Sequence, residues 1–293
     1  MFESQRVGRD FDCSLKGPQM FVRKTVCCWI GLAFVFPVSL VAADGHPLAD
    51  ADRAKLKKEF EGVVAQYASL IRENPQQVEL YSRRGDALFF LGRAEEALAD
   101  YEQMVKRNAK LDASHWRRGI AYFYAGKFEK AAGQFERYHT FDDVDRENGI
   151  WRYLSQYKAY GKPRAQRGLL KYKKDDREPF PDVYKLFAGA ITGAEVLKRI
   201  AAADVDDRER EKRRFYAELY IGLNDYVEGR LKSSQRHLSQ AAKNTWAPQA
   251  GFGPSYMWHV GRLQYNLGRS RSQAAEAGKK QAAGAGKNKS GDK

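Results

Sequence analysis

Apolar and small residues recur at helical spacing in two segments that have nearly the same sequence. Residues 83–102 and 117–136 share nine of twenty positions, at a constant offset of 34 residues. In each copy, positions i, i+4 and i+7 mark one helical face, a glycine follows, and a second apolar stripe begins after it. The first stripe is Tyr81, Gly85 and Leu88 (His115, Gly119 and Tyr122 in the second copy), and the second is Ala97, Tyr101 and Met104 (Ala131, Phe135 and Tyr138). The pattern predicts two consecutive helix–turn–helix units.

The glycines of each unit have two separate roles. Gly85 and Gly119 fall in the middle of a predicted helix, where glycine costs about 1 kcal/mol relative to alanine. We therefore expect them where two helices pack too closely for a Cβ atom. Gly92 and Gly126 end the first helix of each unit and permit a left-handed turn.

A period of 34 residues is typical of helix–turn–helix solenoids, in which each unit stacks on its neighbours. One period upstream, Val63, Val64, Tyr67, Leu70 and Ile71 mirror the second helix of a unit. We therefore expect residues 44–74 to be an N-terminal capping region, with a helix over 51–73. This helix would cover the apolar face that the first full unit leaves open.

The pattern Y-x2-R-G-x-A-L-x3-G-x4-A-x3-Y and its second copy resemble tetratricopeptide repeats, specifically over 78–141. The resemblance implies an all-α, helix–turn–helix solenoid forming a short right-handed superhelix, with two units over 75–143. Pro75 matches the proline that closes a repeat. Arg84 and Arg118 depart from the family, because each stands where a core leucine is common.

Residues 144–268 read as degenerate repeats and terminal helices. Apolar spacing predicts a helix through Ile150 and Tyr157, a break at Gly161, two short helices separated by a turn that Thr192 caps, and a helix–turn–helix unit around Asn224. A terminal helix is predicted to place Tyr256, Met257, Val260 and Leu263 inward.

The order of these elements over 75–268 is similar to that of bacterial outer-membrane tetratricopeptide lipoproteins of the new-lipoprotein-I type. The matching motifs are Trp151-Arg152-Tyr153-Leu154, Phe187-Ala188-Gly189-Ala190-Ile191 and Phe215-Tyr216. This resemblance implies an envelope adaptor that docks peptidoglycan hydrolases and proteases. The lipid-bearing cysteine of those proteins has no counterpart here.

The N-terminal residues predict export. Arg23 and Lys24 precede an apolar run that ends at a small-residue site, Val41-Ala42-Ala43, so we expect 20–43 to be a signal peptide and 1–19 to be an extension upstream of the true start, Met20. The alternative is that the segment is retained as a membrane anchor. All three cysteines precede residue 29, and no Leu-x-x-Cys lipidation pattern follows the apolar run. The expected location is periplasmic or envelope-associated, without a lipid anchor.

The formal net charge of +14 is unevenly distributed. Residues 269–293 have a surplus of five cations and 1–43 a surplus of two, which leaves +7 (14 − 5 − 2) on 44–268. We expect 269–293 to be a disordered basic tail with, at most, weak contact to anionic envelope polymers. The alternative function is a helical-repeat protein that binds nucleic acid or other polyanions through its basic surface, although no specific nucleic-acid motif is present.

No catalytic or metal-binding motif is recognisable, so the sequence favours a protein that is not an enzyme and uses no cofactor. His115 and His139 occupy repeat positions usually filled by packing residues. The acidic runs at 141–145 and 204–207 are expected to begin helices.

Binding of other proteins is therefore assigned to the concave face of the solenoid. There the first helix of each unit presents side chains that belong to neither the packing stripe nor the glycine crossing. The candidate partner-binding residues are Arg83, Asp86, Phe89, Trp116, Arg117, Ile120 and Phe123, with Ser82 beside them. Aromatic residues together with arginine are typical of binding hot spots. The alternative for Phe89 and Phe123 is that neighbouring helices of so short a superhelix bury them. We expect the groove to prefer an apolar or acidic segment, and oligomeric state is left open.

Overall fold

The computed structural model describes residues 45–174 and 176–288, and over these residues the fold is all-α. The predicted extension (1–19) and signal peptide (20–43) lie outside the described residues. The α-helices are α1 (Asp50–Glu73), α2 (Val78–Phe90), α3 (Ala94–Arg107), α4 (Trp116–Tyr124), α5 (Phe128–Phe141), α6 (Arg146–Tyr160), α7 (Lys162–Arg167), α8 (Phe180–Phe187), α9 (Gly193–Ala202), α10 (Asp207–Val227), α11 (Leu231–Lys243) and α12 (Phe252–Asn288). Short 3₁₀ helices lie at Ala109–Leu111 and Ala247–Gln249. Within this part of the chain, each helix falls short of the length or apolarity needed to span a membrane.

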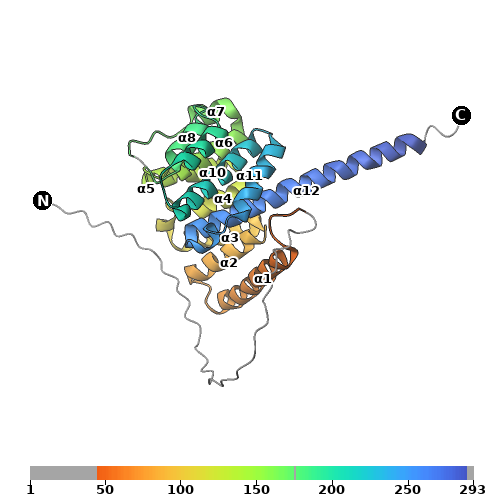
Figure 1. The fold of residues 1–293 in the computed structure, drawn as a ribbon. Helices are drawn as coiled ribbons and strands as arrows, with labels where there is room; N and C mark the ends of the chain where they lie inside the picture. Colours follow the sequence, from red (N-terminus) through yellow and green to blue (C-terminus); the bar gives the residue numbers. More distant parts are fainter. Residues whose placement is uncertain (1–44, 175, 289–293) are drawn as a thin grey trace, which may run out of the picture. The chain divides into compact units, whose positions relative to one another are not determined.

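The helices pack in chain order, as a helical solenoid requires (Figure 1). Three antiparallel hairpins, α2–α3, α4–α5 and α10–α11, supply most of the layers, and α6 to α9 connect the second hairpin to the third. Helix α1 packs against α2, while α12 packs against both α11 and α2. The last helix therefore returns to the first hairpin.

Each hairpin is closed by a side chain that packs directly onto a helical glycine. A Cβ atom on Gly85 would lie 2.7 Å from Cε1 of Tyr101, and one on Gly119 would lie 2.6 Å from Cζ of Phe135. Both distances are shorter than real Cβ contacts, so these crossings require glycine. The predicted reason for the mid-helix glycines is confirmed, and the two units place them in matching surroundings.

A third unit follows the same rule. Gly222 lies where a Cβ would meet Cγ of Leu238 at 2.8 Å, and the partner is again the sixteenth residue after the glycine. In all three hairpins a second glycine seven residues later adopts a left-handed conformation, at Gly92 (φ 80°), Gly126 (φ 73°) and Gly229 (φ 78°). The turn of the third hairpin is therefore at Gly229, and the sequence-based expectation of a turn at Asn224 was wrong, because Asn224 lies inside α10.

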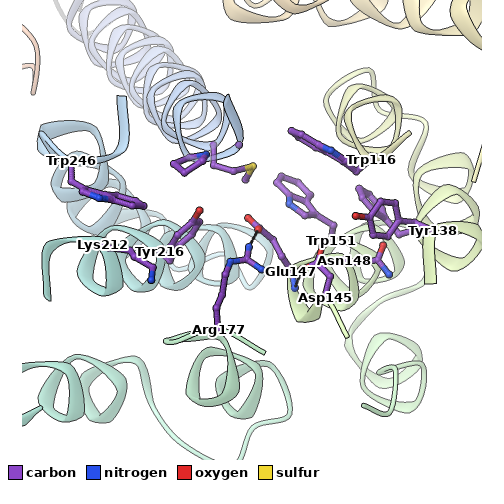
Figure 2. Close-up of a pocket in the computed structure, with 14 residues that line it drawn as sticks. Trp116, Tyr138, Asp145, Glu147, Asn148, Trp151, Arg177, Lys212, Tyr216 and Trp246 are labelled. Carbon is purple, nitrogen blue, oxygen red and sulfur yellow. Dashed lines mark hydrogen bonds and ion pairs between the residues drawn. The ribbon is translucent and has the colours of Figure 1, made fainter. Parts of the chain in front are cut away.

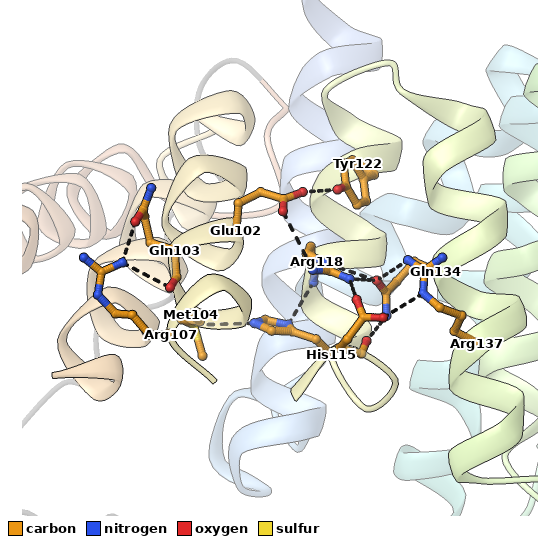
Figure 3. Close-up of polar contacts among 10 residues, drawn as sticks. Glu102, Gln103, Met104, Arg107, His115, Arg118, Tyr122, Gln134 and Arg137 are labelled. Atoms are coloured by element: carbon orange, nitrogen blue, oxygen red, sulfur yellow. Dashed lines mark hydrogen bonds and ion pairs between the residues drawn. The ribbon is translucent and has the colours of Figure 1, made fainter. Parts of the chain in front are cut away.

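The two arginines that replace core leucines are accommodated by polar partners on the second helix of each unit. Arg84 donates from Nε and Nη2 to Asp100, at 2.8 and 2.7 Å. Arg118, which is 3% exposed, donates from Nε to Oε1 of Gln134 at 2.9 Å and also pairs with Asp112 (Figure 3). Asp100 and Gln134 each lie sixteen residues after their arginine, so a polar crossing runs beside each glycine crossing.

Polar caps account for several predicted helix starts. Asp206 accepts a hydrogen bond from the Glu209 amide at 2.7 Å, and Asp145 accepts one from the Glu147 amide at 3.0 Å. Thr192 caps α9 in the same way. These contacts satisfy amide groups that lack a partner within the first turn of a helix. The acidic runs therefore begin helices, as predicted.

Residues 269–288 of the tail that was expected to be disordered form the end of α12, and residues 289–293 lie outside the described part. Two physical reasons explain the error. Alanine, glutamine, lysine and arginine, which dominate this stretch, have high helix propensity. The stretch also extends a helix whose first half is packed, so no new nucleation step is needed.

Replacement of a crossing glycine tests this architecture. Gly119→Ala places a methyl group against the Phe135 ring and should lower the free energy of unfolding by about 1–3 kcal/mol. Gly62→Ala, in exposed surroundings of α1 where a Cβ would meet no atom within 4 Å, should instead raise it by up to about 1 kcal/mol. Urea unfolding of both variants measures the difference. Equal effects at the two positions would contradict a close crossing at Gly119.

Candidate functional site

The inner face predicted as a binding groove is covered by the chain's own last helix. The ring of Tyr256 on α12 stacks on Phe89 of α2, with centroids 5.3 Å apart, and meets the edge of Trp116 of α4 at 4.8 Å. Phe252, at the start of α12, lies 6.2 Å from Trp116. Apolar side chains that would otherwise face solvent are thus buried within the molecule.

A buried polar network fastens this arrangement. Arg117 donates from Nη1 to both carboxylate oxygens of Asp86, each at 2.7 Å, and to Oγ of Ser82 at 2.9 Å. The Tyr101 hydroxyl donates to Oδ1 of Asp86 at 2.7 Å and lies 3.3 Å from the Tyr256 hydroxyl. The network therefore joins the first unit, the second unit and α12.

These contacts change the interpretation of the candidate partner-binding residues. Asp86, Phe89, Ile120 and Phe123 are buried, Arg117 is enclosed in the network, and Arg83 and Trp116 are half-buried. The sequence reasoning treated the first two units as an open groove, but it lacked the position of α12. Of the seven candidates, Trp116 alone lines the cavity described below.

Removal of one ion of this network should be costly. Arg117→Met leaves the buried Asp86 carboxylate without its cation, and we expect the free energy of unfolding to fall by about 3–5 kcal/mol. The double variant Arg117→Met/Asp86→Asn should recover most of this loss, since no charge is then buried alone and an oxygen remains for Tyr101. Chemical unfolding measures both.

Lys57→Met is the matched control, because the Lys57–Glu61 pair is exposed, with 3.8 Å between Nζ and Oε1. Little change in the free energy of unfolding is expected for Lys57→Met. If the double variant were as unstable as the single one, the buried charge would not be the cause.

Beside the network, the inner face encloses a cavity of about 370 Å³ (Figure 2). Its wall is mainly aromatic and its polar residues gather on one side. The lining comes from α4, α5, α6, α10, α12 and three connecting segments: Trp116, Phe135, Tyr138, Asp145, Glu147, Asn148, Trp151, Arg177, Lys212, Tyr216, Trp246, Gly253, Pro254 and Met257. Size and lining are those of a binding pocket for a small molecule or a side chain.

A cluster of ions forms the polar side of the cavity. Arg177, from the segment before α8, donates to Oε2 of Glu147 at 2.6 Å. Its Nη1 lies 3.2 Å from Asp176 and 3.6 Å from Asp145, so one guanidinium serves three carboxylates. The other oxygen of Glu147 accepts a hydrogen bond from the Tyr220 hydroxyl.

This arrangement disfavours ionisation of the carboxylates. Burial, followed by the nearby Glu147, raises the pKa of Asp145 from its ordinary value of 3.8 to about 7. Burial also raises the pKa of Glu147, although Arg177 and the Tyr220 hydroxyl act in the opposite direction. Near neutral pH the cluster therefore tends to retain a proton, which makes it receptive to positive charge.

The histidines have structural positions. His115 caps α4 by accepting from the Arg118 amide at 3.2 Å, and its ring lies 5.0 Å from that of Tyr101. His139 packs edge-on against Tyr172. In the described part of the chain, histidines, cysteines and acidic residues do not gather into a group of three or more that could hold a metal ion.

Most cavity residues were missed by the sequence reasoning, because they come from segments that are far apart in the chain. Asp145 was recognised only within an acidic run at a helix start, and neither Glu147 nor Arg177 was singled out. The one local signal is on α6, where Glu147 and Trp151 lie four residues apart and therefore on the same helical face. No local signal links them to Trp246 or to α12.

The fold and this cavity define the class of the molecule as an all-α helical solenoid with an aromatic, partly acidic pocket on its inner face. A scan against protein-family models gives no match, and a search of curated proteins gives none either.

Stability should depend on pH through Asp145. Between pH 3.8 and about 7 the unfolded chain releases this proton while the folded chain retains it, so stability falls as pH rises across that window. Asp145→Asn keeps a helix-capping side chain and removes this effect. Relative to wild type, the variant should become progressively more stable from pH 4 to 7 and then hold constant.

Unfolding measured at several pH values tests this, with Asp143→Asn as the control. Asp143 is an exposed aspartate two residues away. A flat difference between Asp145→Asn and wild type would contradict the raised pKa.

Proposed function

We propose that this protein is a non-catalytic adaptor of the tetratricopeptide type, which binds other proteins in the cell envelope through the inner face of its solenoid. The observation that carries the proposal is the cavity lined by Trp116, Trp151 and Trp246 beside Arg177. Tryptophan, tyrosine and arginine dominate the energetically important positions of protein interfaces. A cavity of this kind on a helical solenoid suits recognition of a segment from a partner.

The remaining parts of the proposal come from the sequence. The segment 20–43 has the order of a signal peptide, which supports an envelope location, and the resemblance over 75–268 favours hydrolases or proteases of the envelope as partners. The lack of any recognisable catalytic motif supports a binding role.

Site-specific photo-crosslinking in cells tests the adaptor function. A benzoylphenylalanine introduced at Trp246, in the cavity wall, should give covalent adducts with a small set of polypeptides in the envelope fraction. The same group at Leu231, which is 51% exposed at the start of α11, should give few of these adducts. Trp116→Ala should lower the yield of adducts at position 246. Arg117 is not substituted, because it holds the buried network.

Two results would overturn the proposal. One is an identical adduct pattern from positions 246 and 231. The other is turnover of envelope substrates by the purified protein alone, with activity retained in Trp116→Ala.

A further inference from the structure

The cavity walls favour a ligand that is apolar along its length and positively charged at its end. The indoles of Trp116, Trp151 and Trp246 and the ring of Tyr216 line the space. Faces of such rings attract ammonium and guanidinium groups, most strongly where water is displaced. The volume of about 370 Å³ accepts a long side chain with part of its backbone.

The ion cluster also favours a positively charged ligand. Arg177 is shared by three carboxylates, and both oxygens of Glu147 are engaged, one by Arg177 and one by Tyr220. In Asp145, Oδ1 caps the helix and faces Arg177, which leaves Oδ2 for a ligand. A single carboxylate oxygen suits a compact ammonium group, whereas a guanidinium prefers two oxygens in a fork.

Tyr138 of α5 is a titratable neighbour of the cluster, and the other groups around it have contacts of their own. Lys212 of α10, the second cation in the lining, pairs with Glu209 at 2.9 Å. Arg146 places its guanidinium over the Tyr172 ring, 5.3 Å from the centroid. Asp142, after α5, accepts hydrogen bonds from the Val144 and Asp145 amides, and Tyr216 of α10 lies 5.7 Å from the Arg177 guanidinium. These contacts leave Asp145 as the group best placed to receive a cation.

A second, independent feature concerns Trp151. Its side chain is 2% exposed and lines the cavity, yet its Nε1–H has no hydrogen-bond acceptor within the described structure. The comparably buried Trp258 donates from Nε1 to the Ala242 carbonyl at 3.0 Å. A buried donor without an acceptor is costly, so the Trp151 indole is poised for a ligand oxygen.

We propose that the cavity binds a lysine side chain of a partner polypeptide, with the ammonium group at Asp145 and a backbone carbonyl of the same segment accepting from Nε1 of Trp151. The proposal rests on the adaptor function above and specifies the partner's chemistry. It replaces the sequence-based expectation of an apolar or acidic segment. The reason is that the polar side of the cavity holds three carboxylates that share one cation, Arg177. The bound ammonium takes the place of the proton that Asp145 otherwise retains.

Calorimetry with the full chain and capped pentapeptides tests the proposal. The probe is acetyl-Ala-Ala-Lys-Ala-Ala-amide, compared with peptides in which the lysine is norleucine, Nε-acetyl-lysine or glutamate. We expect the lysine peptide to bind at least about tenfold more tightly than each of the others. Its affinity should rise from pH 6 to pH 8, and protons should be released, as seen from heats in buffers of different ionisation enthalpy.

Variants separate the two contacts. Asp145→Asn should weaken lysine-peptide binding about tenfold and abolish the proton release, while Asp143→Asn should change neither. Trp151→Phe should weaken binding several-fold and lower the melting temperature only by the loss of indole volume, since no acceptor loses its donor. Trp258→Phe, which strands the Ala242 carbonyl, should lower the melting temperature and leave binding unchanged.

Equal binding of the lysine and norleucine peptides, or failure of the lysine peptide to bind, would overturn this inference. The adaptor function would survive either result if crosslinks at Trp246 still captured envelope polypeptides. Loss of those crosslinks as well would defeat both.

Discussion

The close contact between a helical glycine and a bulky side chain sixteen residues later is the constraint on which the structure depends. In the first unit, Gly85 lets Tyr101 lie flat against α2, so that its hydroxyl reaches Asp86. Asp86 in turn holds Arg117 from the next unit. The Tyr101 hydroxyl also contacts the Tyr256 hydroxyl, which links the network to α12. The crossing of Gly85 and Tyr101 thus fixes both the register between the two units and the position of the last helix.

The repeat made the first two hairpins predictable to the level of single residues. A local period records helix faces, turn glycines and crossings, since each of these involves residues close in sequence. Gly222 and Gly229 carry the same spacing and could have been recognised as a third unit. The helical end of α12 was missed because a low content of large apolar residues was taken as disorder, although alanine, lysine and glutamine favour helix.

The candidate site was much less predictable. Its residues come from five helices and three connecting segments. Because no repeat relates these elements, the sequence gives no signal that they meet. Trp116 was identified from its place on the inner helix, but the sequence does not show that Trp246, in the segment before α12, and Met257, on α12, line the same cavity. The open groove was predicted wrongly for the same reason: Tyr256 of α12 stacks on Phe89, and Ile120 is also interior.

The return of the last helix also changes how the molecule should fold. An open solenoid frays from its ends, since a terminal repeat has only one neighbour. Here His46, ahead of α1, lies 2.8 Å from Oδ1 of Asn266, and Phe60 and Phe90 both pack on His259 of α12. Both ends of the stack are thereby held together, so neither can melt alone. The gain is all-or-none cooperativity, and the cost is slower folding, because these pairings join residues some two hundred positions apart.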